Sequence, residues 1–181
     1  MTTAHRITRI LAPTAICLLI TGCGYQTVGS YDPKPTGYRW ASLYREDVRT
    51  VAVPVFTNRD FRRGVEIKLT EAVVKQIEAK TPYRVATKDK ADTVLEADIT
   101  SIDVPTLTRD VRTNLPQEQL YTINLNLRWK DLRTGKMLAE RRNFQQTAPY
   151  YSTLGEGSAF GSQQAVERLA LAIVQEMQAD W

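Results

Sequence analysis

The chain has 181 residues, with 24 lysine and arginine residues against 20 aspartate and glutamate residues and a formal net charge of +4. This length suits one domain with a hydrophobic core of its own and is short for two. Two of the basic residues and none of the acids fall in residues 1–22, so the rest of the chain carries +2. So small a charge excludes a general polyanion-binding surface, and we expect no nucleic-acid partner.

Residues 1–22 have the layout of a secretory signal peptide. A basic stretch with Arg6 and Arg9 precedes a mostly apolar run of 11 residues at 10–20, and small residues stand before Cys23. A membrane-spanning helix needs roughly 20 apolar residues. The run is therefore too short to span a membrane, and it predicts a segment that is cleaved.

The end of this segment, Leu19-Ile-Thr-Gly-Cys23, resembles the bacterial lipobox. The resemblance implies that Cys23 is acylated and becomes the first residue of the mature protein. Two or more acyl chains hold a protein stably at a membrane, whereas one chain does so only marginally. Gly24, rather than aspartate, follows the cysteine. By the sorting rule of enteric bacteria this implies anchoring at the periplasmic face of the outer membrane. The alternative is an ordinary signal peptide with a chance cysteine.

Cleavage would remove His5, the only histidine, together with Cys17. The mature chain would keep a single acylated cysteine, which excludes an intramolecular disulfide, cysteine catalysis and thiolate metal sites. Without histidine, Ser-His-Asp catalysis and histidine-ligated metal sites are excluded as well. Glu96 and Asp98 share one strand face, and we interpret them as solvated residues, because nothing nearby indicates an apolar pocket around a carboxylate. We therefore expect no enzyme, no metal and no cofactor.

Glycine and proline punctuate residues 23–47, which predicts an extended tether, and the folded domain is expected over 48–181. Residues 50–56 predict a short buried strand. Apolar residues at helical spacing then predict a helix over 61–80, followed by a second short strand at 83–87.

The next segments show the clearest alternation of apolar and polar residues. Residues 92–104 and 121–130 each place apolar side chains on one face and polar side chains on the other, which predicts two strands. A turn is expected at 131–136, and 137–147 returns as the antiparallel partner. Residues 105–119 are mostly polar and are expected to form a loop.

Residues 148–161 predict a flexible connection to a last helix, in which apolar residues recur at helical spacing from Val166 to Trp181. Within this connection, Gly155–Gly161 resembles a phosphate-binding loop only superficially, because it lacks the Walker lysine and does not lie in a βαβ unit. The expected order is β-α-β-β-β-β-α. Two helices with one apolar stripe each, and strands with one apolar face, predict an α+β two-layer sandwich. Its helices would pack on a mostly antiparallel sheet of four or five strands.

Basic residues cluster in the sequence around the longer strands. They are Arg109, Arg112, Arg128, Lys130, Arg133, Lys136, Arg141 and Arg142. Such a cluster suits phosphate groups, which accept charge-assisted hydrogen bonds. The alternative is an ordinary solubilising surface, since acidic residues lie between the basic ones.

Four segments of the chain together resemble the LptE-type lipopolysaccharide-assembly lipoproteins. They are Gly22-Cys-Gly-Tyr25, Val51-Ala-Val-Pro-Val-Phe-Thr-Asn58, Gly64-Val-Glu-Ile-Lys-Leu-Thr-Glu-Ala72 and Ala91-Asp-Thr-Val-Leu-Glu-Ala-Asp-Ile99. The likeness spans nearly the whole mature chain in the same order. It implies a fold of two helices on a four-stranded sheet, which agrees with the helices and strands predicted above.

The resemblance also implies a function. Members of this family sit inside the lumen of a large outer-membrane β-barrel, the LptD translocon, help it to assemble, and bind lipopolysaccharide on its way outward. The family has no catalytic residues to carry over. Candidate lipopolysaccharide contacts in this chain are Arg109, Arg112, Lys130 and Arg133, which we choose for their chemistry because no family motif aligns with them.

A different class of protein is the alternative. The strand at 51–56 and the amphipathic helix after it also resemble the periplasmic module of TolB- and CsgG-type envelope proteins. CsgG-type lipoproteins oligomerise as secretion channels, so this alternative predicts an oligomer rather than a plug for one barrel.

Overall fold

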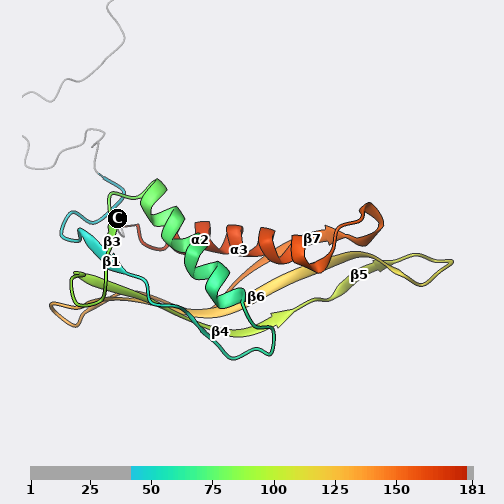
Figure 1. Cartoon of the computed structure of the whole chain (residues 1–181), viewed down its shortest axis with the longest axis horizontal. Coiled ribbons are helices and arrows are strands. Elements are labelled where there is room, and N and C mark those ends of the chain that lie inside the picture. Colours follow the sequence, from blue (N-terminus) through green and yellow to red (C-terminus); the bar gives the residue numbers. More distant parts are fainter. Residues whose placement is uncertain (1–41, 179–181) are drawn as a thin grey trace, which may run out of the picture. The chain divides into compact units, whose positions relative to one another are not determined.

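Two helices lie on one face of a mixed β-sheet in the computed structural model, which describes residues 42–178 (Figure 1). The predicted signal peptide, Cys23, the tether up to residue 41 and Trp181 lie outside the described residues. Tyr44 forms an isolated antiparallel bridge with Gln178. The described chain therefore begins beside the end of the last helix.

The described residues form two long helices, seven strands and one short 3₁₀ helix. In chain order these are β1 (Thr50–Ala52), β2 (Thr57–Asn58), α2 (Val65–Lys80), β3 (Arg84–Val85), β4 (Thr93–Asp103), β5 (Thr106–Arg109), β6 (Pro116–Asp131), β7 (Met137–Tyr151), η2 (Ser152–Leu154) and α3 (Ser158–Gln175).

Long antiparallel strands form the centre of the sheet. β6 pairs with β4 along one edge and with β7 along the other. β5 continues the line of β4 and pairs with the first residues of β6. β1 and β2 pair in parallel with β4, and β3 pairs in parallel with β1. The seven strands thus lie in five columns, and the predicted α+β class is confirmed, whereas the number and order of strands differ from the prediction.

The predicted strand at 50–56 is divided into β1 and β2. Pro54 lies between them, and proline has no N–H for the sheet ladder. The next helix begins at Val65 rather than at Phe61, because Gly64 in front of it has a φ of 89°, in the left-handed region. Phe61 is exposed and does not belong to the apolar stripe of α2.

The expected loop at 105–119 is wrong, because β5 and the start of β6 form a hairpin there. The hairpin extends beyond the two helices (Figure 1), so neither of its faces is covered by a helix and its strands lack the apolar alternation that marks a half-buried strand. The flexible connection expected at 148–161 is also shorter than predicted. β7 continues to Tyr151, with Ala148 and Tyr150 buried, and α3 begins at Ser158.

The core lies between the helices and one face of the sheet. From β6 the side chains of Tyr121, Ile123, Leu125, Leu127 and Trp129 are buried, as the alternation predicts. From the helices the buried apolar residues are Val65, Leu69, Val73 and Ile77 of α2 and Ala165, Val166, Leu169, Ala170, Ile173 and Val174 of α3, with Met177 just after α3. The opposite face of the sheet, which we call the open face, carries the polar residues of the same strands.

One glycine fixes the distance between α3 and the sheet. A Cβ built on Gly161 would overlap the ring of Tyr150, a buried residue of β7. Any larger residue at position 161 would therefore push α3 away from β7.

Candidate functional site

The open face carries a row of alternating charges across neighbouring strands. Glu96 of β4 lies between Lys88 and Arg128, at 3.9 and 3.7 Å. Arg128 is paired in register with Glu140 of β7, whose carboxylate lies 3.1 Å from Arg142. Each of these exposed ion pairs contributes little to stability. Together they leave a surface that is strongly polar and nearly balanced in charge.

Hydrogen-bonded hydroxyl and amide groups continue the open face toward the hairpin. The side chain of Asn124 donates to Ser101 Oγ at 2.9 Å and to Asp103 Oδ2 at 3.1 Å. The hydroxyls of Thr122 and Thr147 lie 3.0 Å apart on paired strands. This ordered polar layer is the feature of the sheet that a polar partner surface can contact.

The four basic residues predicted as lipopolysaccharide contacts do not form one cluster. Arg109 and Arg112 lie at the end of the β5–β6 hairpin, where Arg109 pairs with Pro116. Lys130 and Arg133 lie at the other end of β6, fourteen residues from Pro116, and strand geometry places the two ends roughly 45 Å apart. The structure thus brings the residues together as two separate pairs.

The end of the hairpin is an ordered turn. Asp110 accepts hydrogen bonds from the backbone N–H groups of Arg112 and Thr113, at 2.9 and 2.7 Å. The hydrogen bond from the Thr113 N–H is the main reason why the pKa of Asp110 is lowered from its ordinary value. Arg109 Nη1 donates to the carbonyl oxygen of Asn114 at 3.1 Å. The Arg112 side chain, by contrast, has no partner among residues 42–178, so it is available to a ligand.

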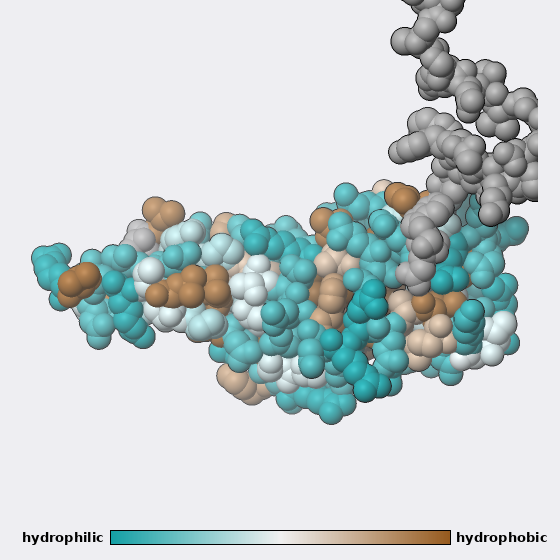
Figure 2. All heavy atoms as spheres, turned by 180° about the vertical axis from the view of Figure 1, so that it is seen from behind, coloured by the Kyte–Doolittle hydropathy of each residue, from teal (hydrophilic) through white to brown (hydrophobic). Residues whose placement is uncertain are grey.

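Exposed apolar side chains lie along this hairpin and in η2 beside it, and sequence reasoning missed them. Leu107, Val111 and Leu115 are 53%, 104% and 64% exposed, and Leu154 of η2 is 74% exposed. Figure 2 shows separate apolar patches among hydrophilic residues along the projecting end of the described domain. The sequence does contain a signal for them, because leucine and valine residues stand in the polar stretch 105–119 without the periodicity of a buried strand or helix face. Guanidinium groups beside exposed apolar side chains suit a molecule that carries both phosphate and hydrocarbon. We call this surface the hairpin tip.

Arg133, at the other end of β6, is held by contacts within the protein. Arg133 lies 3.8 Å from Asp92 and 3.6 Å from Asp131, and its Nη2 donates to the carbonyl oxygen of Asp47 at 2.9 Å. The pKa of Asp92 is lowered, mainly because its carboxylate accepts a hydrogen bond from the backbone N–H of Arg49. Burial raises this pKa, whereas the positive charge of Arg133 lowers it further. Arg133 therefore holds the β6–β7 turn to the segment that leads into β1.

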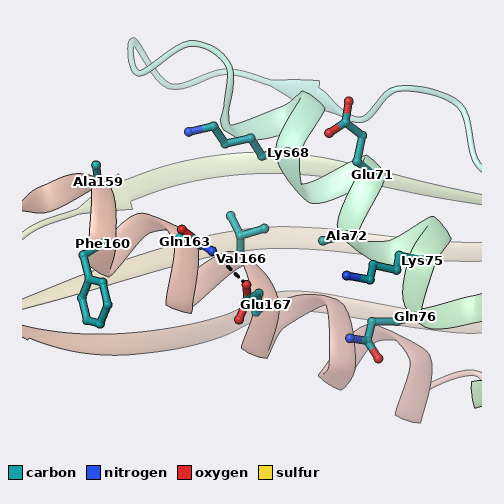
Figure 3. A pocket seen from close by; sticks show the side chains of 10 residues that line it. All are labelled: Lys68, Glu71, Ala72, Lys75, Gln76, Ala159, Phe160, Gln163, Val166 and Glu167. Atoms are coloured by element: carbon teal, nitrogen blue, oxygen red, sulfur yellow. Dashed lines mark hydrogen bonds between the residues drawn. The ribbon is translucent and has the colours of Figure 1, made fainter. Parts of the chain in front are cut away.

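A groove of about 810 Å³ runs between the outward surfaces of α2 and α3 (Figure 3). Its walls carry Lys68, Glu71, Lys75 and Glu167, with Ala72 and Val166 between them. Opposite charges alternate along it, and Gln163 of α3 donates to Glu167 at 3.2 Å. The groove therefore lacks the continuous apolar lining that an acyl chain needs.

Residues 42–178 hold neither a cluster of metal-ligating side chains nor a membrane-spanning helix. No group of three or more His, Cys, Asp or Glu residues there is arranged to hold a metal ion. None of the helices in this part of the chain is long and apolar enough to cross a membrane.

Solved structures share the fold at low sequence identity. A protein from Xanthomonas campestris is 15% identical, with a TM-score of 0.52, over 71% of this chain and 82% of that one. A hypothetical protein from Chlamydia trachomatis is 12% identical, with a TM-score of 0.51, over 70% of this chain and 94% of that one. An uncharacterized lipoprotein B from Nitrosomonas europaea is 13% identical, with a TM-score of 0.50, over 75% and 88% of the two chains. At these identities the similarity establishes the fold alone.

Comparison with curated protein sequences found no match. The model of one protein family, described as LptE, lipopolysaccharide-assembly, matches residues 48–180. This match includes every helix and strand of the domain, the open face and the hairpin tip. The chain therefore belongs to the LptE family of lipopolysaccharide-assembly proteins.

Proposed function

We propose that this protein is an outer-membrane lipoprotein, acylated at Cys23, that plugs a large β-barrel lipopolysaccharide translocon of the LptD type and assists its assembly. Membership of the family supports a role in lipopolysaccharide assembly without enzymatic activity. The partner, the outer-membrane location and the lipid contact are parts of the proposal.

The observation that carries the proposal is the open face of the sheet. Most apolar side chains of β4, β6 and β7 lie in the core or pack against it, so the sheet presents mainly its polar side to a partner. That side presents the charged row from Lys88 to Arg142 and the hydrogen-bonded layer around Asn124. The lumen of an outer-membrane barrel is polar, and such a surface is complementary to it.

The hairpin tip is the proposed contact for lipopolysaccharide. Arg109 and Arg112 supply guanidinium groups for phosphate, and Leu107, Val111 and Leu115 supply apolar surface for hydrocarbon. Lys130 and Arg133 lie too far from the tip to contact the same phosphate, and Arg133 is held by Asp92 and Asp131. The tip pair therefore carries the lipid half of the proposal.

The barrel interaction is tested by purifying the tagged full-length protein from detergent-solubilised membranes and identifying the bound proteins by mass spectrometry. We expect one large outer-membrane barrel at a fixed ratio to the tagged chain. Recovery of the chain as a homo-oligomer without a barrel would reject the plug and favour the CsgG-like alternative. The intact mass of the same sample should show an acylated chain that begins at Cys23, and an unmodified chain with residues 1–22 retained would reject the anchor.

The lipid contact is tested with purified lipopolysaccharide and charge-reversal pairs. Arg109→Glu with Arg112→Glu should weaken binding, and the wild-type affinity should fall with added salt because screening weakens exposed charge contacts. Lys130→Glu with Lys136→Glu, at the other end of β6, is the matched pair and should bind as the wild type does. Loss of binding only in the second pair would place the lipid contact at the Lys130 end of β6 and reject the hairpin tip.

A further inference from the structure

We infer that a second site, in the cavity between the N-terminal ends of α2 and α3, binds a phosphate group. The cavity has a volume of about 330 Å³. It is lined by Arg62, Arg63, Gly64, Val65, Lys68, Val104, Tyr121, Ser158, Ala159 and Ser162. The charged side chains in this lining are all basic. Arg62 is engaged with Asp60 and the carbonyl oxygen of Ile102, and Arg63 donates to the carbonyl oxygen of Asn58 at 3.5 Å. Neither Arg63 nor Lys68 forms an ion pair within residues 42–178.

The N-terminus of α3 opens into this cavity without a cap. Gly157 precedes the helix, no side chain caps its first turn, and that turn holds no acidic residue. The N–H groups of Phe160 and Gly161 are bonded to the Gly157 carbonyl oxygen, which leaves those of Ser158 and Ala159 for a ligand. Free N–H groups at a helix N-terminus attract anions.

The N-terminus of α2 differs, because it already has an anion. Glu66 lies in its first turn, and its pKa is lowered first by a hydrogen bond from its own backbone N–H and then by one from Asn58. The positive end of α3 is therefore the one that remains without a negative partner.

Two hydroxyl-bearing residues that are largely covered line the cavity. Ser162 and Tyr121 both line the cavity and are only 8% and 4% exposed. Within residues 42–178 neither hydroxyl forms a hydrogen bond with another protein group. The two hydroxyl oxygens are not sealed from solvent, and an acceptor in the cavity would accept hydrogen bonds from both.

The donors around the cavity define the class of ligand. They are a guanidinium group, an ammonium group, backbone N–H groups and hydroxyls, and together they match the several oxygen acceptors of a phosphate group. That phosphate is either free or carried by a lipid, and the chemistry of the site is the same for both. The site shares no residue with the hairpin tip, so the inference does not rest on the proposed function.

The test is an NMR titration of the mature chain carrying Cys23→Ser, with inorganic phosphate and pyrophosphate as probes and sodium chloride at matched ionic strength as the blank. We expect saturable shifts of the Ser158 and Ala159 amide signals with a phosphate probe and not with chloride. Arg63→Gln with Lys68→Gln should weaken binding about tenfold or more, since each lost contact is charge-assisted. Arg84→Gln with Lys90→Gln, on the exposed side of the β3 end, is the matched control and should bind normally.

Hydroxyl deletions and lipid probes sharpen the result. Ser162→Ala and Tyr121→Phe should each weaken binding several-fold, and unchanged affinity in both would contradict this placement of the site. A detergent-solubilised phosphoglycolipid and its dephosphorylated form distinguish the two sources of phosphate. If the phosphorylated lipid binds and neither inorganic phosphate nor the dephosphorylated lipid does, the site is specific for lipid-borne phosphate. Equal binding of both lipids, or no shift with any probe, would overturn the inference and leave the barrel and the hairpin tip untouched.

Discussion

The two ends of β6 differ in burial. From Tyr121 to Trp129 every second side chain is buried under the helices, and Trp129 Nε1 donates to the buried Thr93 hydroxyl at 3.1 Å. From Pro116 to Leu120 no residue is fully buried, because the hairpin extends past the helices. One strand therefore supplies both the core and a projecting surface, and the difference lies in whether a helix covers it. Substitutions at the first end should change folding, and substitutions at the second end should change binding.

The largest effect is expected from a charge placed in the core. Leu125→Asp or Leu169→Asp buries an unpaired carboxylate at a fully covered position, which costs several kcal/mol and should unfold the domain. Leu115→Asp makes the same chemical change at the hairpin tip, where the side chain is exposed, and should leave the melting temperature nearly unchanged. Thermal melts of the mature chain carrying Cys23→Ser compare them, and equal destabilisation by Leu115→Asp would mean that the tip is packed.

A smaller loss is expected where α3 contacts β7. Gly161→Ala forces a methyl group into the Tyr150 ring and should lower stability by about 1–3 kcal/mol. Gly157→Ala is the control, because a Cβ there meets nothing within 4 Å. In a protein that already carries Tyr150→Leu, Gly161→Ala should lower stability less than it does in the wild type, because the ring that the methyl group meets is absent. A double-mutant cycle measures this difference. Additive effects would show that the two residues do not interact.

The hairpin tip should respond in binding and not in stability. Changing Leu107, Val111 and Leu115 together to serine removes exposed apolar surface, and we expect lipopolysaccharide affinity to fall about tenfold at an unchanged melting temperature. Ile67→Ser, at an exposed position on α2, is the control for lost surface hydrophobicity. Full affinity in the triple variant would limit the tip to its two arginines.

Acid should weaken the end of the domain that Arg133 holds. The folded-state pKa of Asp92 is lowered from 3.8, so its contribution is complete above that pH and is lost as the pH falls through the folded-state pKa. The unfolding free energy of the wild type should therefore decrease in acid more steeply than that of Asp92→Asn. Denaturant melts at neutral and acidic pH measure this, and parallel pH profiles for the two proteins would contradict it.

The smallest effect is expected from a single charge on the open face. Glu96→Gln removes the ion pairs to Lys88 and Arg128, both of which are exposed and screened. The unfolding free energy should change by no more than about 0.5 kcal/mol. A loss comparable to that of Leu125→Asp would show that the assignment of strand faces is wrong.

The alternation in β4 and β6, the stripes of both long helices and the turn at 131–136 were predictable because their periodicity records which side faces the core. The hairpin of β5 and β6 was not predictable in this way, because no helix covers it and its residues carry no alternation. For the candidate lipopolysaccharide contacts, the sequence indicated which residues are basic but not which of them lie close together in space. Arg109 and Lys130 are close to the same strand in the sequence but lie at its opposite ends.

The sequence by itself determined the α+β class, the buried faces and the family, because these depend on local periodicity and on motifs that stand in order along the chain. Only the tertiary structure decided which basic residues share a surface. It also decided that Leu107, Val111 and Leu115 are exposed on the same hairpin as Arg109 and Arg112, and that Ser162 and Tyr121 line one cavity at the N-terminus of α3. The physical reason is that proximity between residues far apart in the chain is set by strand pairing and helix packing, and local sequence patterns carry no record of either.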